Sequence, residues 1–459
     1  AKLIIANPRS AEADRLAFRR LRHRPGAELA LLQALAAALV QSPPMVTPPP
    51  VAQTEGQEAA APPEPQPRDL SNLRTALGNV TVEQAAQAAG VTADAIQAAA
   101  AALAGANRPV IYAGSRLALR ADAEGLAAAL VSLAEALGNR RAVGFFPDGP
   151  NGRGAAFAGL VPGEGGLPAG EIIAQAAEGT IKALYLAGEN VLETHPDREQ
   201  AQRALENAEL VIVHELFPTD TARMADVVFS ATPVAEKDGS LTNAEGRIQR
   251  IHRAVITDAG GPRPDWRILA DLSAEMGAAL GYAAATEVTR DLLADLPVYA
   301  ATGGKLPAEG IICHEYGSET DGTEGGVSTG RTLPSIDTVG GTSVGAASGG
   351  LTLITYAELL GDETVVRATP ELLEMVPAPY VEVNRADAER LGLVDGQFAE
   401  LATERGSVTR LVRVNGRCPE GVCYTPENVG QPRVNAIMNW NTPLPTVRLT
   451  PVREPVAAG

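Results

Sequence analysis

The feature that most constrains the fold is the alternation of apolar strands and helical segments over residues 181–231. IKALYLA (181–187), ELVIVHE (209–215) and DVVFSA (226–231) have the composition of buried strands. The helical PDREQAQRALENA lies between the first two, and the shorter FPTDTARMA lies between the second and third. Short strand–helix–strand connections predict a parallel sheet with right-handed crossovers. Ligands of such sheets bind beyond the carboxyl ends of the strands, so the loops there are the first candidates for a site.

Polar residues are concentrated in the loops that follow these strands. The candidate cofactor-binding residues are Gly188, Glu189, Asn190, Thr219, Thr221, Glu236, Lys237 and Asn243. Their amide, hydroxyl, carboxylate and ammonium groups suit a polar cofactor. Each also has an ordinary structural interpretation, since glycine permits a tight turn, Thr219 caps a short helix, and asparagine bonds to nearby backbone. The stretch AEKDGSLTNAEGRIQR (235–250) has no strand or helix period, and its residues alone leave a ligand loop and a structural loop equally open.

The composition indicates an α/β protein with an aliphatic core. Apolar residues make up 45% and aromatic residues 4% of 459, and this length suggests two to four domains. The 38 Lys and Arg against 55 Asp and Glu give a net charge of −17, which argues against a nucleic-acid or anionic-membrane partner. No apolar run reaches the length of a membrane span, and no signal peptide is evident. We therefore expect a soluble, cytoplasmic protein.

No residue set predicts catalysis or a metal site. The chain has three cysteines, Cys313, Cys418 and Cys423, too few for a disulfide framework or an iron–sulfur cluster of its own. The pair in CPEGVC is read as a strand and turn rather than a metal ligand. No G-x-G-x-x-G follows a strand, which disfavours nicotinamide binding. The histidines are scattered, and Cys313–His314 carries little weight as a nucleophile and base because no strand-to-helix elbow precedes it.

The chain as a whole divides into four expected parts. It begins inside a strand-like segment, KLIIA, so we expect a fragment whose N-terminal part is missing. Short β runs separated by turns after residue 351 predict a small barrel. The expected parts are an α/β domain at 1–145 with a Pro-rich insertion at 41–68, a second α/β domain at 146–283, a Gly/Ser-rich linker or insertion at 284–350, and a β-barrel at 351–459.

Several segments, in order along the chain, resemble the molybdopterin oxidoreductase superfamily. ADVVFSATPVAEKDGSLTNAEGRIQ resembles its "ADVVLP…EK-GT-TN-EGR-Q" pattern, and LYLAGEN and FPTDTARMADVV resemble its "LY--GeNP" and "f-TETA-ADVV". KLIIANPRSAEADRLA resembles an early strand and loop, and PYVEVNRADAERLGLVDGQFAELATERGSV resembles the C-terminal domain. The resemblance implies two Rossmann-like parallel-sheet domains followed by a double-psi β-barrel. The eight candidate residues would then line a pterin crevice, either working or relic.

Within the superfamily, the chain most resembles the large iron–sulfur subunit of NADH-quinone oxidoreductase (respiratory complex I). NAEGRIQRIHRAVITDAGGPRPDWRILADLSAEMG and NGRGAAFAGLVPG resemble its segments, while GENV and TDTA depart from the GENP and TETA of molybdenum enzymes. We expect a scaffold portion of the peripheral arm, not catalytic by itself, that supports electron transfer from NADH to quinone. Its partners would be other peripheral-arm subunits, at the cytoplasmic side of the membrane.

This resemblance also implies what the chain would bind. Iron–sulfur clusters are expected only in the missing N-terminal part, and no cofactor is assigned to this chain with certainty, molybdopterin guanine dinucleotide being the alternative. The first alternative function is a catalytic formate-dehydrogenase-like subunit that holds molybdenum or tungsten on two pterin guanine dinucleotides. The second is an assembly or binding module without a redox role.

Overall fold

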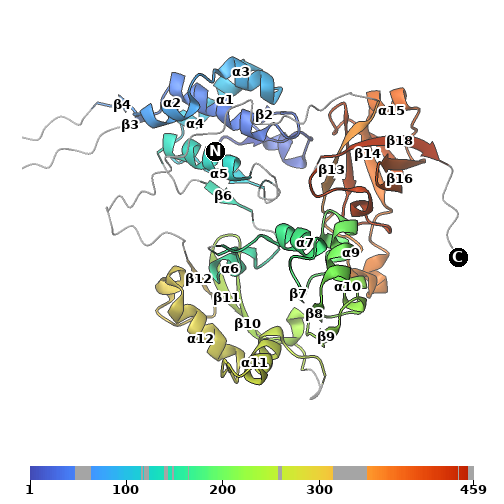
Figure 1. Ribbon diagram of the computed structural model, residues 1–459. Helices are drawn as coiled ribbons and strands as arrows, with labels where there is room; N and C mark the ends of the chain where they lie inside the picture. The colour runs from blue at the N-terminus through green and yellow to red at the C-terminus, as the bar shows by residue number, and fades with distance from the viewer. Residues whose placement is uncertain are drawn as a thin grey trace, which may run out of the picture.

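The computed structural model describes residues 1–46, 64–114, 117, 123–138, 143–146, 149–163, 165–256, 261–313, 349–442 and 444–452. They form an N-terminal α/β part, a second α/β part and a C-terminal barrel (Figure 1). The Pro-rich residues 47–63, His314 and the Gly/Ser-rich residues 314–348 lie outside the described residues. The domain boundaries expected from the sequence stay predictions.

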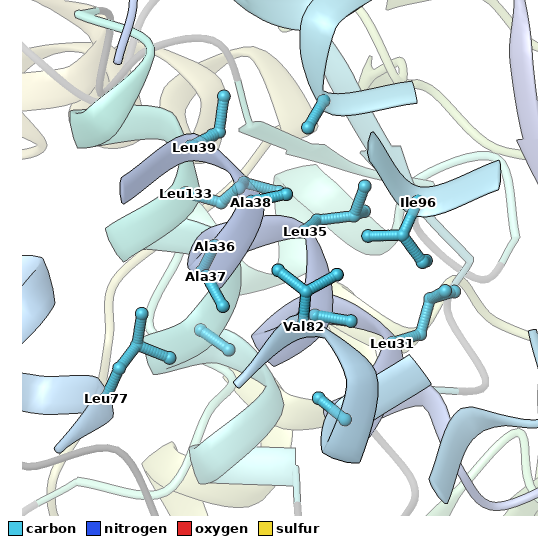
Figure 2. Close-up of a cluster of buried hydrophobic side chains, with 14 of the residues drawn as sticks. Leu31, Leu35, Ala36, Ala37, Ala38, Leu39, Leu77, Val82, Ile96 and Leu133 are labelled. Carbon is cyan, nitrogen blue, oxygen red and sulfur yellow. The ribbon is translucent and has the colours of Figure 1, made fainter. Parts of the chain in front are cut away.

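The N-terminal part is built around one buried helix, α1 (Glu28–Gln41). Its alanine and leucine side chains are buried nearly all round, and they form the cluster seen in Figure 2 with Leu77, Val82, Ile96 and Leu133. Small alanines allow the neighbouring helices to approach closely, so the core needs few aromatic rings. The neighbours are α2 (Ser71–Leu77), α3 (Val82–Ala89), α4 (Ala93–Ala104) and α5 (Ala123–Ala136).

The strands of this part are short and pair in twos. β1 (Ile4–Ala6) runs parallel to β2 (Arg19–Leu21), with the 3-10 helix η1 (Glu12–Leu16) between them. β5 (Ile111–Ala113) runs parallel to β6 (Val143–Phe145). β3 (Met45–Val46) and β4 (Gln66–Pro67) pair at the two ends of the Pro-rich stretch. Thr81 and Thr92 cap the starts of α3 and α4, since each hydroxyl accepts a backbone N–H of the first turn.

The second part contains the predicted parallel sheet. β7 (Ala183–Ala187), β8 (Leu210–Glu215) and β9 (Val227–Ser230) lie side by side in that order, all parallel. α7 (Ala169–Ala177) and α9 (Arg198–Asn207) pack together and cover one face through Ile173, Ala201 and Leu205. The remaining helices of the run are α6 (Gly152–Phe157), α8 (Val191–Thr194) and α10 (Asp220–Arg223).

Residues 235–250 are not the unpatterned loop that the sequence indicated. After the turn η4 (Val234–Glu236), β10 (Gly239–Thr242) and β11 (Arg247–Ile251) form an antiparallel hairpin, extended by β12 (Ile311–Ile312). Thr242 and Ile248 are buried, whereas most of their neighbours are exposed or partly exposed, so the hydrophobic alternation is too weak to read from the sequence.

Part of the stretch expected to be a linker is also structured. α12 (Ala285–Asp295) and η5 (Pro297–Thr302) pack with this hairpin through Leu293 and Tyr299, and α11 (Asp265–Glu275) precedes them. Residues 285–313 therefore belong to a folded unit with the hairpin.

The C-terminal part is a closed six-stranded barrel, as the family resemblance implied. Its strand order is β13-β17-β14-β16-β15-β18, with parallel pairs β13–β17 and β14–β16. Its strands are β13 (Leu351–Tyr356), β14 (Tyr380–Asn384), β15 (Phe398–Thr403), β16 (Gly406–Asn415), β17 (Val422–Pro426) and β18 (Thr446–Val452). Its short helices are α13 (Thr364–Arg367), α14 (Pro370–Leu373), α15 (Arg385–Leu391) and η7 (Val434–Ile437).

Cys423 lies in the hydrophobic core of the barrel, and Cys418 packs in a separate cluster with Val422 and Tyr424. Both thiols are buried, and burial raises the pKa of Cys418 to about 12. Burial raises the pKa of Cys423 as well. A thiol that keeps its proton is a poor metal ligand, so the strand-and-turn interpretation of CPEGVC agrees with the structure.

Candidate functional site

The loops after β7 and β8 meet at one edge of the sheet because the strands are parallel. Gly188 turns the chain directly after β7 with a φ of +67°, and its N–H donates to His214 O at 2.9 Å. A Cβ at Gly188 would meet no atom within 4 Å, so this turn borders open space. The positive φ, rather than crowding, is what favours glycine here.

Asn190 and Thr221 join the two loops. The Thr221 hydroxyl donates to Asn190 Oδ1 at 2.7 Å and accepts the Leu192 N–H at 3.2 Å. Thr221 is fully buried. The Asn190 Nδ2 atom is also buried and finds no hydrogen-bond partner in the described part of the chain. The two loops are thus joined by direct contact, and one amide donor is left over. That these residues bind a cofactor stays a prediction.

The other polar residues at these loops have local partners. Thr219 caps α10, because its Oγ1 accepts the Ala222 N–H at 3.1 Å. The Glu189 carboxylate accepts a hydrogen bond from the Thr194 hydroxyl. Burial, followed by the nearby Glu189 and Asp265 carboxylates, raises the pKa of Glu215 at the end of β8. The edge therefore concentrates negative charge.

Lys237 reaches the same edge by a different route. Its Nζ lies 2.6 Å from Asp265 Oδ2 at the start of α11, and Asp265 Oδ1 lies 3.6 Å from Nδ1 of His214. Glu236 lies in η4, where its backbone N–H donates to Pro233 O. Lys237 thus ties the segment after β9 to α11.

Asn243 closes the β10–β11 hairpin. Its Oδ1 accepts the N–H groups of Glu245 and Arg247, at 2.9 and 3.0 Å, and its own N–H donates to Arg247 O. Of the two interpretations that the sequence left open, the structure places Asn243 in ordinary turn chemistry.

Sequence reasoning missed the barrel side of the edge. Glu193, in α8, pairs with Arg367 at 2.7 Å and with Arg433 at 3.2 Å, and Arg433 also pairs with Asp362. The Asn435 amide donates to the carbonyls of Leu192, Glu193 and His195 at 3.1, 3.3 and 2.9 Å. The sequence carried no local signal for these contacts, because the partners are separated by 71 to 243 residues.

A second set of barrel contacts lies at the start of α9. Asp197, which caps α9, accepts from Arg405 at 2.6 Å and from the Trp440 N–H at 3.3 Å. The Trp440 ring stacks on His195 with 5.3 Å between centroids and covers Gly170, where a Cβ would lie 2.2 Å from the ring. The barrel is therefore fixed directly on α7, α8 and α9, and Figure 1 shows α7 and α9 beside it.

A cavity of about 300 Å³ separates the N-terminal loop after β1 from the barrel. Arg9 enters from this loop, pairs with Glu382 at 2.5 Å, and lies 5.0 and 5.4 Å from the ring centroids of Tyr356 and Tyr424. Arg417 also lines it. In the sequence, NPRS is only part of a segment that resembles the family, and no pattern there marks Arg9 or Arg417 as site residues.

A polar dinucleotide fits part of the sheet edge at the ends of β7 and β8. The buried Asn190 Nδ2 without a partner and the open space beside Gly188 suit an acceptor-rich ligand. Lys237 and Asn243 already bond to other groups of the chain, so they have fewer donors and acceptors left for a ligand. Residues 188–190, with Thr219 and Thr221 behind them, are the ones that would hold such a group.

Comparison with known proteins decides the family. The "Molybdopterin oxidoreductase" model matches residues 49–275, and the "Molydopterin dinucleotide binding domain" model matches residues 351–447. The chain belongs to the molybdopterin oxidoreductase family. The acetylene hydratase of Pelobacter acetylenicus has the same fold, with a TM-score of 0.73 over 98% of this chain and 74% of that chain at 15% identity.

Curated relatives of this family member differ in their names. The NADPH-Fe(3+) oxidoreductase subunit alpha of Geobacter sulfurreducens is 28% identical over 96% of this chain and 51% of its own length. The G 2 subunit of the NADH-quinone oxidoreductase of Rhizobium meliloti is 30% identical over 61% of this chain and 31% of its own. F420-dependent formate dehydrogenase 1 subunit alpha of Methanococcus maripaludis is 28% identical over 60% and 42%. The chain thus spans about half or less of the length of these relatives.

Proposed function

We propose that this chain is a scaffold portion of a subunit of the NADH-quinone oxidoreductase type, which supports electron transfer without a reaction of its own. What carries the proposal is that the polar groups of the crevice are mostly bound within the protein. Asn190 Oδ1 is held by Thr221, Lys237 by Asp265, and Asn243 by its own hairpin. Groups that hold chain segments together are not available to a ligand unless those bonds break.

The docking of the barrel supports the same proposal. Glu193 lies in the helix after the Gly188 turn, and two barrel arginines bind it. Arg433 is buried, so removing either partner would leave a charge with poor compensation. The loop that would have to adapt to a dinucleotide is thus held by the barrel on its far side.

The names of two relatives favour electron transfer driven by a nicotinamide nucleotide. Because the matched sequence covers at most about half of those relatives, the nucleotide, the iron–sulfur clusters and the quinone would be handled by other parts of the assembly. We propose the other peripheral-arm subunits as partners and the cytoplasmic face of the membrane as the location. Among the described residues, no helix combines the length and apolarity needed to cross a bilayer.

One observation favours the alternative of a catalytic formate-dehydrogenase-like subunit. The buried Asn190 Nδ2 has no partner in the described part of the chain, and a buried donor is usually satisfied. In that alternative, residues 188–190 would hold the dinucleotide tail, and the bound molybdenum or tungsten would supply two-electron chemistry.

Isolation of the full-length native protein with a C-terminal tag separates the two functions. The scaffold predicts co-purification with flavin and iron–sulfur subunits and NADH-driven quinone reduction. Asn190→Ala should change the rate per assembled complex by less than about twofold, because a residue outside the reaction does not stabilise its transition state. Formate oxidation by the native protein that Asn190→Ala abolishes would instead establish the catalytic alternative. Recovery of the tagged protein without redox subunits and without formate oxidation would contradict both and leave the assembly module as the remaining alternative.

A further inference from the structure

A tyrosine, a histidine and an aspartate form a connected line on the face of the β7–β9 sheet opposite α7 and α9. The Tyr185 hydroxyl is hydrogen-bonded to Nε2 of His214 on the neighbouring strand. His214 is fully buried, between the Tyr185 and Phe229 rings, which meet it edge-on at 5.1 and 5.5 Å between centroids. Its other nitrogen, Nδ1, has no hydrogen-bond partner among the described residues and lies 3.6 Å from the Asp265 carboxylate.

The hydrogen bond between Tyr185 and His214 defines the direction in which a proton would move. Burial and the Asp265 carboxylate raise the pKa of Tyr185, so the phenol keeps its proton at neutral pH. The phenol therefore donates, Nε2 accepts, and the proton of the neutral imidazole lies on Nδ1, toward Asp265. A second proton on Nε2 would give an imidazolium whose charge faces that carboxylate.

Charged groups from three elements surround the histidine. Asp265 comes from α11, and Glu215 follows His214 at the end of β8. Lys237, from the segment after β9, is the opposing cation, and it is already paired with Asp265 at 2.6 Å. Phe229, from β9, is apolar. Tyr185 itself is 40% exposed, so an oxidant in solution can reach its ring.

We propose that Tyr185 is a redox-active tyrosine whose oxidation is coupled to proton transfer to His214. A strong one-electron oxidant, such as an oxygen-derived radical, removes one electron from the phenol. The O–H bond breaks, an N–H bond forms at Nε2, and the products are a neutral tyrosyl radical, an imidazolium and the reduced oxidant. Asp265 is a positioning residue that stabilises the imidazolium. Tyr185 then acts as the preferred donor of single electrons on this part of the protein, which protects less accessible groups from oxidation. This role of Tyr185 is independent of the proposed function.

The native chain contains its own reference residue for a test. Tyr112 is 63% exposed and stacks on Phe146 at 5.0 Å between ring centroids. Ruthenium(III) tris-bipyridine, generated by light and persulfate, would oxidise the protein in the presence of a nitroso spin trap. Peptide mass spectrometry then gives the yield of adduct at each tyrosine. Oxidation governed by exposure alone would label Tyr112 more than Tyr185.

We expect several-fold more adduct on Tyr185 than on Tyr112 in the native protein. His214→Gln keeps a hydrogen-bond acceptor for the phenol but removes the base, so the excess on Tyr185 should disappear while the thermal unfolding curve checks the fold. A native ratio that follows exposure overturns the proposal without any variant. An excess that persists in folded His214→Gln overturns it as well.

Discussion

At the scale of single residues, the hydroxyl of Thr221 holds two chain segments at once. It donates to Asn190 and accepts from the backbone of Leu192. Thr221→Val replaces it with a methyl group of similar size. The buried Leu192 N–H then loses its partner, and Asn190 Oδ1 keeps only the longer bond from the Thr221 backbone N–H at 3.4 Å. We expect a loss of about 1–3 kcal/mol in the free energy of unfolding, measured with urea. Thr450→Val, on the exposed face of β18, is the matched control and should be near neutral. Equal effects of the two changes would show that the Thr221 bonds add nothing.

A second residue-scale prediction concerns His195. Burial lowers its pKa from the ordinary 6.5, against the smaller raising effects of Gln200 and Asp197. The unfolded chain therefore binds a proton more readily than the folded chain just below 6.5, and stability must fall as the pH drops through that range to the lowered folded pKa.

His195→Phe keeps a ring for stacking on Trp440 and removes the titration. The free energy of unfolding of this variant, followed from pH 7 towards pH 5, should fall less than that of the native protein. Parallel curves for the two proteins would show that His195 does not contribute to the acid sensitivity.

At the scale of elements, the packing of α7 against the barrel depends on a glycine, Gly170, near the start of the helix. A Cβ on Gly170 would lie 2.2 Å from the Trp440 ring, so Gly170→Ala must displace this ring from its stack on His195 or push α7 and the barrel apart. We predict a loss of about 1–3 kcal/mol in unfolding free energy, together with easier acrylamide quenching of tryptophan fluorescence. Gly163→Ala, where no atom lies within 4 Å, should leave both measurements unchanged. Quenching unaffected by Gly170→Ala would rule out this packing role.

Elements with a strong local pattern were predictable from the sequence. The strands of 181–231 were predictable because each is apolar and bounded by a polar loop. β10 and β11 were missed because they are short, polar and only partly buried. Their position depends on contacts with Tyr299 and Asn151, which no local pattern records.

The candidate site was predictable only in its sheet-edge half. Strand ends locate Asn190 and Thr221, and their contact follows from a parallel sheet. Glu193 could not be recognised, since its partner Arg433 lies 240 residues away in another part of the fold. A polar residue in a turn, such as Asn243, looks the same in sequence whether it binds a ligand or the neighbouring backbone.

At the scale of the whole molecule, the union of the second α/β part and the barrel depends on buried charge. The Arg433 side chain is 2% exposed and binds both Glu193 and Asp362. Glu193→Gln removes one of the two carboxylates that bind Arg433, and we expect about 1.5–3 kcal/mol less stability, measured by chemical denaturation. Glu209→Gln is the control, because Glu209 is 71% exposed and its pair with Lys182 should contribute only about 0–1 kcal/mol. Comparable losses in both variants would contradict a special role for the buried cluster.

We propose that the loops after β7 and β8 join the second α/β part to the barrel and do not hold a metal–pterin cofactor. The most direct test of this proposal is elemental analysis for molybdenum and tungsten on the full-length native protein, combined with fluorescence assay of oxidised pterin. We expect neither metal above the level of a protein-free control, and no pterin. Stoichiometric metal with pterin, lost in Asn190→Ala, would contradict it and identify a working enzyme site.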